Sequence, residues 1–366
     1  MTPETLLAAI DQALAFDFEA VGPKQVQRAL SQETLSLADL GALLSKAALS
    51  YLEPMAQKAR VLTRRHFGLN VALFTPLYLA NFCVNQCLYC GYNAHNKVLR
   101  GALTLEEIAK ELLAIKNEGF TDVLLLTGES RLKSSPAYVT AAVKLAAESF
   151  ASVGLEVYPL KTPEYQKVQK AGADYVCVYQ ETYDPIVYAK AHLLGPKKDY
   201  LWRLMALERA LEAGVRGVGL GALLGLANFR RDVLALGAHG QYLRSIYPEA
   251  EIAYSTPRLR PVPGAREPFG EVSDAELTQI ILALRLFSPT FGLTLSTRER
   301  PYLRDHLMGL GVTRLSAGVR TSVGGRAGQV AGEEQFIKAD ERRLSEVEAA
   351  IKAKGLQPVF TDYARL

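Results

Sequence analysis

The chain has 366 residues, of which 49% are hydrophobic and 22% charged, and its formal net charge is +4 at pH 7. This balance excludes a disordered chain, and the small charge predicts no nucleic-acid partner. No apolar stretch is long enough to span a membrane. The N-terminal segment has the pattern of an amphipathic helix with acidic residues rather than a signal peptide, so we expect a cytoplasmic protein.

Hydrophobic periodicity and helix stop signals divide the chain into two parts. Four helices are predicted in the first 70 residues, at 3–15, 23–30, 36–48 and 53–66. Eight strands follow, predicted at 71–79, 122–127, 155–160, 175–180, 217–223, 252–256, 293–296 and 312–317. The helices predicted between and after the strands are 105–118, 137–150, 163–171, 200–213, 232–246, 273–287, 300–310 and 340–354.

Eight strand–helix units indicate an α/β fold, a parallel (β/α)8 barrel of the TIM type. An open doubly wound sheet is the alternative, but the number of strands favours closure. We therefore expect an N-terminal helical segment over residues 1–70 and a barrel with a C-terminal tail over residues 71–366. The glycine-rich segment 323–332 is expected to form a flexible loop over the barrel mouth.

Three of the four cysteines, Cys83, Cys87 and Cys90, lie close together directly after the first predicted strand. In a reducing compartment such clustering favours a metal site over disulfides. The C-x3-C-x2-C spacing is typical of radical S-adenosylmethionine (SAM) enzymes, in which three thiolates bind a [4Fe–4S] cluster and leave one iron open. Structural zinc is the weaker alternative, because it needs a fourth ligand and Cys177 lies inside a predicted strand.

Resemblance to radical SAM enzymes assigns SAM-binding roles to residues near strand ends. Tyr89 matches the aromatic residue that lies beside the adenine. Thr127, Gly128 and Glu129 resemble the G-G-E element that binds the methionine amino group, with threonine in place of the first glycine.

Residues at the end of the fourth predicted strand and beyond it extend this resemblance. Gln180 and Glu181 are expected to contact the SAM ribose or the substrate, and Arg203 is expected to pair with the SAM carboxylate. Residues 217–226, GVGLGALLGL, are not a dinucleotide fingerprint, because their glycines lie in a strand rather than in a turn that opens a helix. They match the family element that passes under the adenine, where glycine permits close approach of a ligand.

Ser296 and Arg298, at the end of the seventh predicted strand, are candidates for binding a substrate carboxylate. His239 lies on a predicted helix, where a lone histidine is more often structural than catalytic. Arg258 and Arg260 follow the sixth predicted strand and are either structural or anion-binding.

Longer runs narrow the resemblance to one family. LYLANFCVNQCLYCGY, LLLTGES, VYQETYDPIVYAKAHLLGPKKDYLWRL, GLGALLGL, PRLRP and LSTRER resemble the tyrosine lyases of thiamine biosynthesis, the ThiH or 2-iminoacetate synthase family. The related HydG proteins of hydrogenase maturation carry additional C-terminal cysteines for a second cluster. No cysteine follows Cys177 here, so that second, carbon-monoxide-forming site is not expected.

The resemblance implies cleavage of the Cα–Cβ bond of L-tyrosine to 2-iminoacetate (dehydroglycine) and p-cresol, with SAM converted to 5′-deoxyadenosine and methionine. It places Ser296 and Arg298 on the tyrosine carboxylate and His239 near the phenol. It also implies the thiazole synthase ThiG as partner and a flavodoxin- or ferredoxin-type electron donor, which the sequence does not specify. Alternatives that stay open are a lyase for another aromatic amino acid, such as tryptophan, and a non-catalytic cluster scaffold.

Overall fold

The computed structural model describes residues 3–260, 270–328 and 330–361. Eight parallel strands follow one another around a barrel, and pairing of the eighth with the first closes it, which confirms the predicted fold class. The strands are β1 (Asn70–Ala80), β2 (Asp122–Thr127), β3 (Ser152–Glu156), β4 (Tyr175–Glu181), β5 (Gly217–Ala222), β6 (Glu251–Ser255), β7 (Gly292–Leu295) and β8 (Arg314–Ser316).

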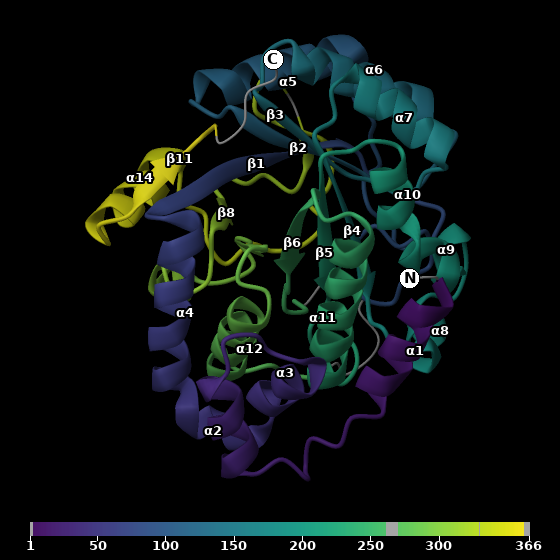
Figure 1. The fold of residues 1–366 in the computed structure, drawn as a ribbon. Coiled ribbons are helices and arrows are strands. Elements are labelled where there is room, and N and C mark those ends of the chain that lie inside the picture. Colours follow the sequence, from purple (N-terminus) through teal and green to yellow (C-terminus); the bar gives the residue numbers. More distant parts are fainter. Residues whose placement is uncertain (1–2, 261–269, 329, 362–366) are drawn as a thin grey trace.

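Helices cover the outside of the barrel (Figure 1), and several of them are capped by a side chain at the first turn. For example, Thr104 and Ser273 cap α5 and α12, each accepting a hydrogen bond from the backbone of a glutamate three residues later. The outer helices are α5 (Leu105–Asn117), α6 (Pro136–Ala147), α7 (Thr162–Ala171), α8 (Pro185–Ala191), α9 (Tyr200–Leu204), α10 (Ala206–Glu212), α11 (Phe229–Ile246), α12 (Asp274–Phe287), α13 (Pro301–Leu307) and α14 (Leu344–Ala353).

Four helices precede the barrel: α1 (Pro3–Leu14), α2 (Pro23–Ser31), α3 (Leu37–Leu44) and α4 (Leu52–Phe67). They pack mainly against α11 and α12, in the lower part of Figure 1. We propose residue 70, where β1 begins, as the boundary between this helical segment and the barrel.

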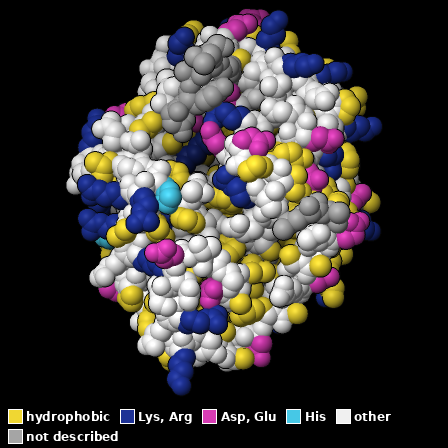
Figure 2. Space-filling view, in the orientation of Figure 1, with side chains coloured by type: hydrophobic (Ala, Val, Ile, Leu, Met, Phe, Trp, Pro, Cys, Tyr) yellow, Lys and Arg dark blue, Asp and Glu magenta, His cyan; other side chains and the backbone are white. Residues whose placement is uncertain are grey.

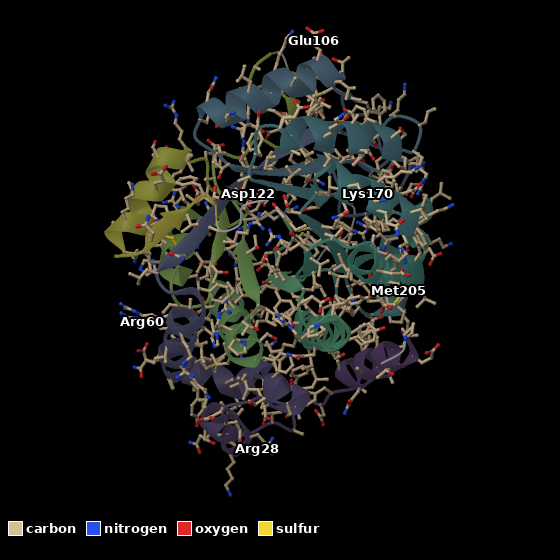
Figure 3. The ribbon with its side chains drawn as sticks, turned by 45° about the horizontal axis from the view of Figure 1, so that its top comes forward. Arg28, Arg60, Glu106, Asp122, Lys170 and Met205 are labelled. Atoms are coloured by element: carbon tan, nitrogen blue, oxygen red, sulfur yellow. The ribbon has the colours of Figure 1, made fainter. Side chains whose placement is uncertain are left out.

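Several element bounds differ from those predicted. Strand β3 lies three to four residues earlier than the predicted 155–160, and the single helix predicted over 200–213 is interrupted at Met205 between α9 and α10 (Figure 3). The described residues of 323–332 include two short strands, β9 (Val323–Gly324) and β10 (Val330–Gly332), which pair with each other. Because β9 also pairs with β1, the prediction of a loose loop over the mouth was wrong.

Glycines on β3 and β5 make room for large side chains inside the barrel. A Cβ atom on Gly154 would lie 2.0 Å from the ring of Tyr175, and one on Gly221 would lie 2.5 Å from the ring of Tyr179. Gly219 likewise faces Cys177 at 2.5 Å. The strand glycines Gly154, Gly219 and Gly221 therefore accommodate neighbouring side chains, and a position of residues 217–226 under the adenine stays a prediction.

Strand β1 has more partners than any other described strand. It pairs with β2 and β8 inside the barrel, with β9 near its end, and with β11 (Gln357–Val359) at its start. Its last residue, Ala80, leads directly into the segment that carries the clustered cysteines. The strand that holds this segment is therefore the most firmly fixed part of the sheet.

The outer surface carries both signs of charge. On the face drawn in Figure 2, lysine and arginine side chains are interspersed with aspartate and glutamate. Among the described residues, no helix is both long enough and apolar enough to cross a membrane.

Candidate active site at the carboxyl end of the barrel

The cysteine loop that follows β1 is held by hydrogen bonds from two other segments. The amide of Gln86 donates to the carbonyl of Leu194 (2.9 Å), and the amide of Leu193 donates back to the carbonyl of Gln86 (3.0 Å). The amide of Val84 donates to the carbonyl of Glu129 at 2.9 Å. The ends of β2 and α8 thus fix the positions of Cys83, Cys87 and Cys90, none of which forms a disulfide.

The three thiols lie close enough to influence one another electrostatically. Burial raises the pKa of Cys87 to about 12; the charges of Cys90 and Cys83 add to this, while Lys197 opposes it. Among the described residues, however, no three His, Cys, Asp or Glu side chains converge on the position of one metal ion. A zinc ion needs such convergence, whereas three thiolates that bind three different irons do not. The arrangement therefore fits a cluster better than zinc.

A cavity of about 160 Å³ opens at the carboxyl ends of the strands, next to this loop. It brings together predicted site residues from three separate parts of the chain, namely Tyr89, Glu181, Ser296 and Arg298. The other polar residues in its wall are Tyr78, Cys90, Glu156, Tyr179, Lys197, Ser255, Arg260, Thr294, Thr297, Ser316 and Gln335.

Glu181 anchors one side of this cavity. It adopts a left-handed backbone conformation with φ of +72°, where β4 departs from regular pairing with β5. Its carboxylate lies 2.7 Å from the Lys197 ammonium and 3.5 Å from the Arg203 guanidinium. Burial raises the pKa of Glu181, but these two cations outweigh that effect, so its net pKa is lowered and the group is ionised.

Tyr89 is oriented by a buried histidine on the segment after α8. The Nδ1 atom of His192 lies 2.8 Å from the carbonyl oxygen of Tyr188, so this nitrogen carries the proton. Nε2 of His192 therefore accepts the hydrogen bond from the Tyr89 hydroxyl at 2.7 Å. Lys197 lies over the same tyrosine ring, 5.5 Å from its centroid.

Thr127, Gly128 and Glu129 lie against the cysteine loop, outside the cavity lining. A Cβ atom on Gly128 would lie 2.4 Å from the carbonyl oxygen of Phe82, so only glycine fits here. The Glu129 carboxylate accepts a hydrogen bond from Asn85 at 2.6 Å. The buried hydroxyl of Thr127 has no partner among the described residues.

Ser296 and Arg298 form the opposite side of the cavity, where a second segment holds them. The Ser296 hydroxyl accepts a hydrogen bond from the Arg298 amide at 3.3 Å. The Arg298 guanidinium stacks on the ring of Phe336, 3.6 Å from its centroid. The amides of Ala339 and Asp340 donate to the carbonyl of Thr297 at 2.9 and 3.1 Å, so residues 336–340 form a strap over this strand end.

Six residues predicted to bind SAM or substrate do not line the cavity: Thr127, Gly128, Glu129, Gln180, Arg203 and His239. Gln180 faces away from it, because side chains alternate along β4 and its neighbours Tyr179 and Glu181 face inward. Both polar atoms of the Gln180 side chain are buried without a partner among the described residues. His239, on α11, lies 3.0 Å from the hydroxyl of Tyr183, and burial lowers its pKa to about 3. Neither Gln180 nor His239 lines the cavity, so the structure gives no support for a substrate contact by either.

The two arginines after β6 have different environments. Arg258 is buried and pairs with Glu299 and Asp274, which makes it structural. Arg260 lines the cavity and donates to the carbonyl of Arg298.

Four residues of the site were not predicted from the sequence, namely Lys197, Glu156, Asn85 and Gln335. Lys197 and Glu156 are charged and line the cavity, and Gln335 hydrogen-bonds the Tyr78 hydroxyl at 2.9 Å. Asn85 lies inside the cysteine motif itself, so its position could have drawn attention to it. No local sequence signal distinguishes the other three.

A parallel barrel with three free thiols on the loop after its first strand, next to a charged mouth cavity, is the arrangement of a radical SAM enzyme. Residues 77–235 match the radical SAM superfamily, and residues 255–357 match the biotin and thiamin synthesis associated domain. The 2-iminoacetate synthases of Escherichia coli K12 and Salmonella typhimurium are each 42% identical over 339 residues, covering 92% of this chain and 90% of theirs.

Among solved structures, HydG from Carboxydothermus hydrogenoformans, an FeFe-hydrogenase maturase, superimposes with a TM-score of 0.90 and 32% identity. The match covers 98% of this chain and 85% of that one. The chain belongs to the 2-iminoacetate synthase family of radical SAM enzymes. Membership of this family implies a [4Fe–4S] cluster and SAM.

Proposed function

We propose that the protein is a radical SAM lyase that cleaves the Cα–Cβ bond of L-tyrosine to 2-iminoacetate and p-cresol for the thiazole of thiamine. The observation that carries this proposal is a single cavity that contains both Tyr89 of the cysteine loop and the pair Ser296–Arg298. Cofactor chemistry and substrate binding can therefore meet at the same place. Family membership supports the choice of reaction.

Cys83, Cys87 and Cys90 would hold the cluster, and the wall beside them would bind SAM. A bound, reduced cluster with SAM would supply the 5′-deoxyadenosyl radical that removes hydrogen from the tyrosine amino group, with methionine as the other product. Homolysis of the Cα–Cβ bond gives 2-iminoacetate, and one electron and one proton convert the side-chain fragment to p-cresol.

The chain supplies orientation and charge around this chemistry. The planar Arg298 guanidinium, held by Phe336, suits bidentate binding of the tyrosine carboxylate, and the Ser296 hydroxyl lies beside it. Tyr89 would lie beside the adenine, and Arg203 would pair with the SAM carboxylate. The Thr127 hydroxyl, which is buried without a partner among the described residues, fits a ligand group near Glu129.

We also propose a partner enzyme and a location. Because 2-iminoacetate hydrolyses readily, it would be passed directly to the thiazole synthase ThiG in the cytoplasm. A flavodoxin- or ferredoxin-type protein would supply the electron.

The test is an anaerobic assay with reconstituted cluster, SAM, tyrosine and a strong reductant. We expect p-cresol and 5′-deoxyadenosine in equal amounts by mass spectrometry, with both lost in Cys87→Ala and both retained in the matched control Cys177→Ala. Formation of 5′-deoxyadenosine without p-cresol would show that tyrosine is not the substrate, and tryptophan would be tested next.

A further inference from the structure

Glu156, the last residue of β3, is a carboxyl group in the cavity wall for which the described residues provide no partner. Its side chain lines the cavity, yet it forms neither a hydrogen bond nor an ion pair with any described residue. An acidic group enclosed in this way is costly unless a ligand or a proton compensates its charge. The other carboxylate in the wall, Glu181, is already paired with Lys197.

The barrel topology places Glu156 opposite the proposed carboxylate site. In the closed order β1 to β8, strands β3 and β7 are four positions apart, so they form opposite walls. Arg298 follows β7, and its positive charge and the negative charge of Glu156 influence each other across the cavity. A positive group on one wall and an acidic group on the other match the two charges of an α-amino acid.

The other groups that act on Glu156 come from several elements. A negative charge arises from Glu181 on β4, and positive charges arise from Arg298, Arg203 and Lys197. The tyrosines on β1 and β4 that interact with it, Tyr78 and Tyr179, stay neutral, because burial raises the pKa of both. Cys177, deeper in the barrel, is neutral for the same reason.

We propose that Glu156 binds the α-ammonium group of the amino-acid substrate and accepts one proton from it, so that the nitrogen is a neutral amine when hydrogen is removed. The inference rests on the proposed function. The step is a proton transfer only: an N–H bond of the ammonium breaks, an O–H bond forms on the carboxylate, and no electron is exchanged.

Burial supports this role by making the group a stronger base than an ordinary glutamate. It raises the pKa of Glu156 to about 7, which narrows the gap to the pKa of an amino-acid ammonium. An aspartate in place of Glu156 would be one methylene shorter, so it would keep the negative charge but its carboxylate would not extend as far into the cavity.

The test compares Glu156→Gln with wild type and with Glu106→Gln, a control that removes a fully exposed glutamate on α5 (Figure 3). The binding of two ligands is measured by anaerobic equilibrium dialysis with cluster and SAM present. These ligands are L-tyrosine and 3-(4-hydroxyphenyl)propionate, which lacks only the amino group. The electron paramagnetic resonance change that SAM causes in the reduced cluster is measured without either ligand.

We expect Glu156→Gln to weaken tyrosine binding about 10-fold or more and to leave binding of the amino-free analogue within about 2-fold. The SAM-induced spectral change stays as in wild type. In wild type, p-cresol formation should rise with pH near pH 7 as Glu156 ionises, and this rise should be absent from Glu156→Gln. Equal weakening of both ligands would overturn the proposal, as would loss of the SAM effect, which would assign Glu156 to SAM instead. If wild type binds tyrosine with this amino selectivity but forms no p-cresol, the proposed reaction fails while the ammonium site stands.

Discussion

The Nζ atom of Lys197 lies 2.7 Å from Oε1 of Glu181, and the same ammonium lies over the ring of Tyr89. One side chain thus links the end of β4, the segment after α8 and the cysteine loop. The backbone amide of Lys197 adds a further link, because it donates to Asn85 within the cysteine motif at 2.9 Å. Lys197 therefore lies between the cysteine loop and the end of β4, although it belongs to no recognisable sequence motif.

Replacing Lys197 with methionine should weaken SAM binding. The change keeps the length of the side chain but leaves Glu181 with only the more distant Arg203, at 3.5 Å, as a cation. A buried carboxylate that loses its closest partner costs about 1–3 kcal/mol, which corresponds to about 5- to 150-fold in affinity if binding needs the ionised group. Titration of SAM against the electron paramagnetic resonance signal measures this effect. Lys198→Met, next to it and exposed, should leave the titration unchanged.

Replacing Gly128 with alanine should displace the cysteine loop. The added methyl group would lie 2.4 Å from the carbonyl oxygen of Phe82, so the backbone must move. We expect a loss of about 1–3 kcal/mol in the free energy of unfolding and lower iron content after reconstitution. Gly214→Ala is a useful comparison, because its Cβ would meet nothing within 4 Å and its cost would arise only from its positive φ. Normal iron content in Gly128→Ala would contradict the close packing described here.

Replacing Phe336 with alanine should raise the KM for tyrosine more than it lowers kcat. The ring supports the Arg298 guanidinium from 3.6 Å, and without it the arginine loses its fixed orientation. We expect a KM increase of about 5- to 30-fold, in line with a cation–π contact of about 1–2 kcal/mol. The SAM-induced spectral change should persist. Phe336→Tyr, which keeps the aromatic face, should restore most of the affinity.

Replacing His239 with glutamine should make the protein less sensitive to acid without affecting turnover. Burial lowers the pKa of His239 to about 3. The neutral side chain therefore stabilises the fold above pH 6.5, and this contribution is lost as the pH falls towards 3. Between pH 6.5 and 5, the free energy of unfolding measured with denaturant should depend less on pH than in wild type, by up to about 1.4 kcal/mol per pH unit. Exposed His306→Gln is the control, and a large loss of tyrosine turnover in His239→Gln would restore a role at the substrate.

The barrel was predictable because its signals are local and repeated. Alternation of strands and helices gave all eight strands, and the cysteine spacing located the loop after β1. The bounds of β3 were wrong because Val157, Tyr158 and Leu160 are buried like strand residues although they follow the strand. Pairing with β2 stops at Glu156, opposite Leu126. The error hid Glu156, since a strand end is where a barrel presents its functional side chains.

Other misses depend on contacts between distant segments. Lys197 and Lys198 are adjacent and look alike in the sequence, and the hydrogen bond from Lys197 to Asn85 joins residues 112 positions apart. Gln180 could have been judged better. Strand alternation alone says that it and Glu181 face opposite sides, so both could not line one cavity.

The four partners of β1 have a consequence for how different parts of the protein open. Freeing this strand requires breaking its pairing with β2, β8, β9 and β11 together, so its amide hydrogens should exchange with solvent only when the whole barrel unfolds. The cysteine segment beyond Ala80 lies outside this sheet pairing and is held by hydrogen bonds to the segments that follow β2 and α8. We therefore expect hydrogen exchange in the cysteine segment to report local opening, and exchange in β1 to report global unfolding.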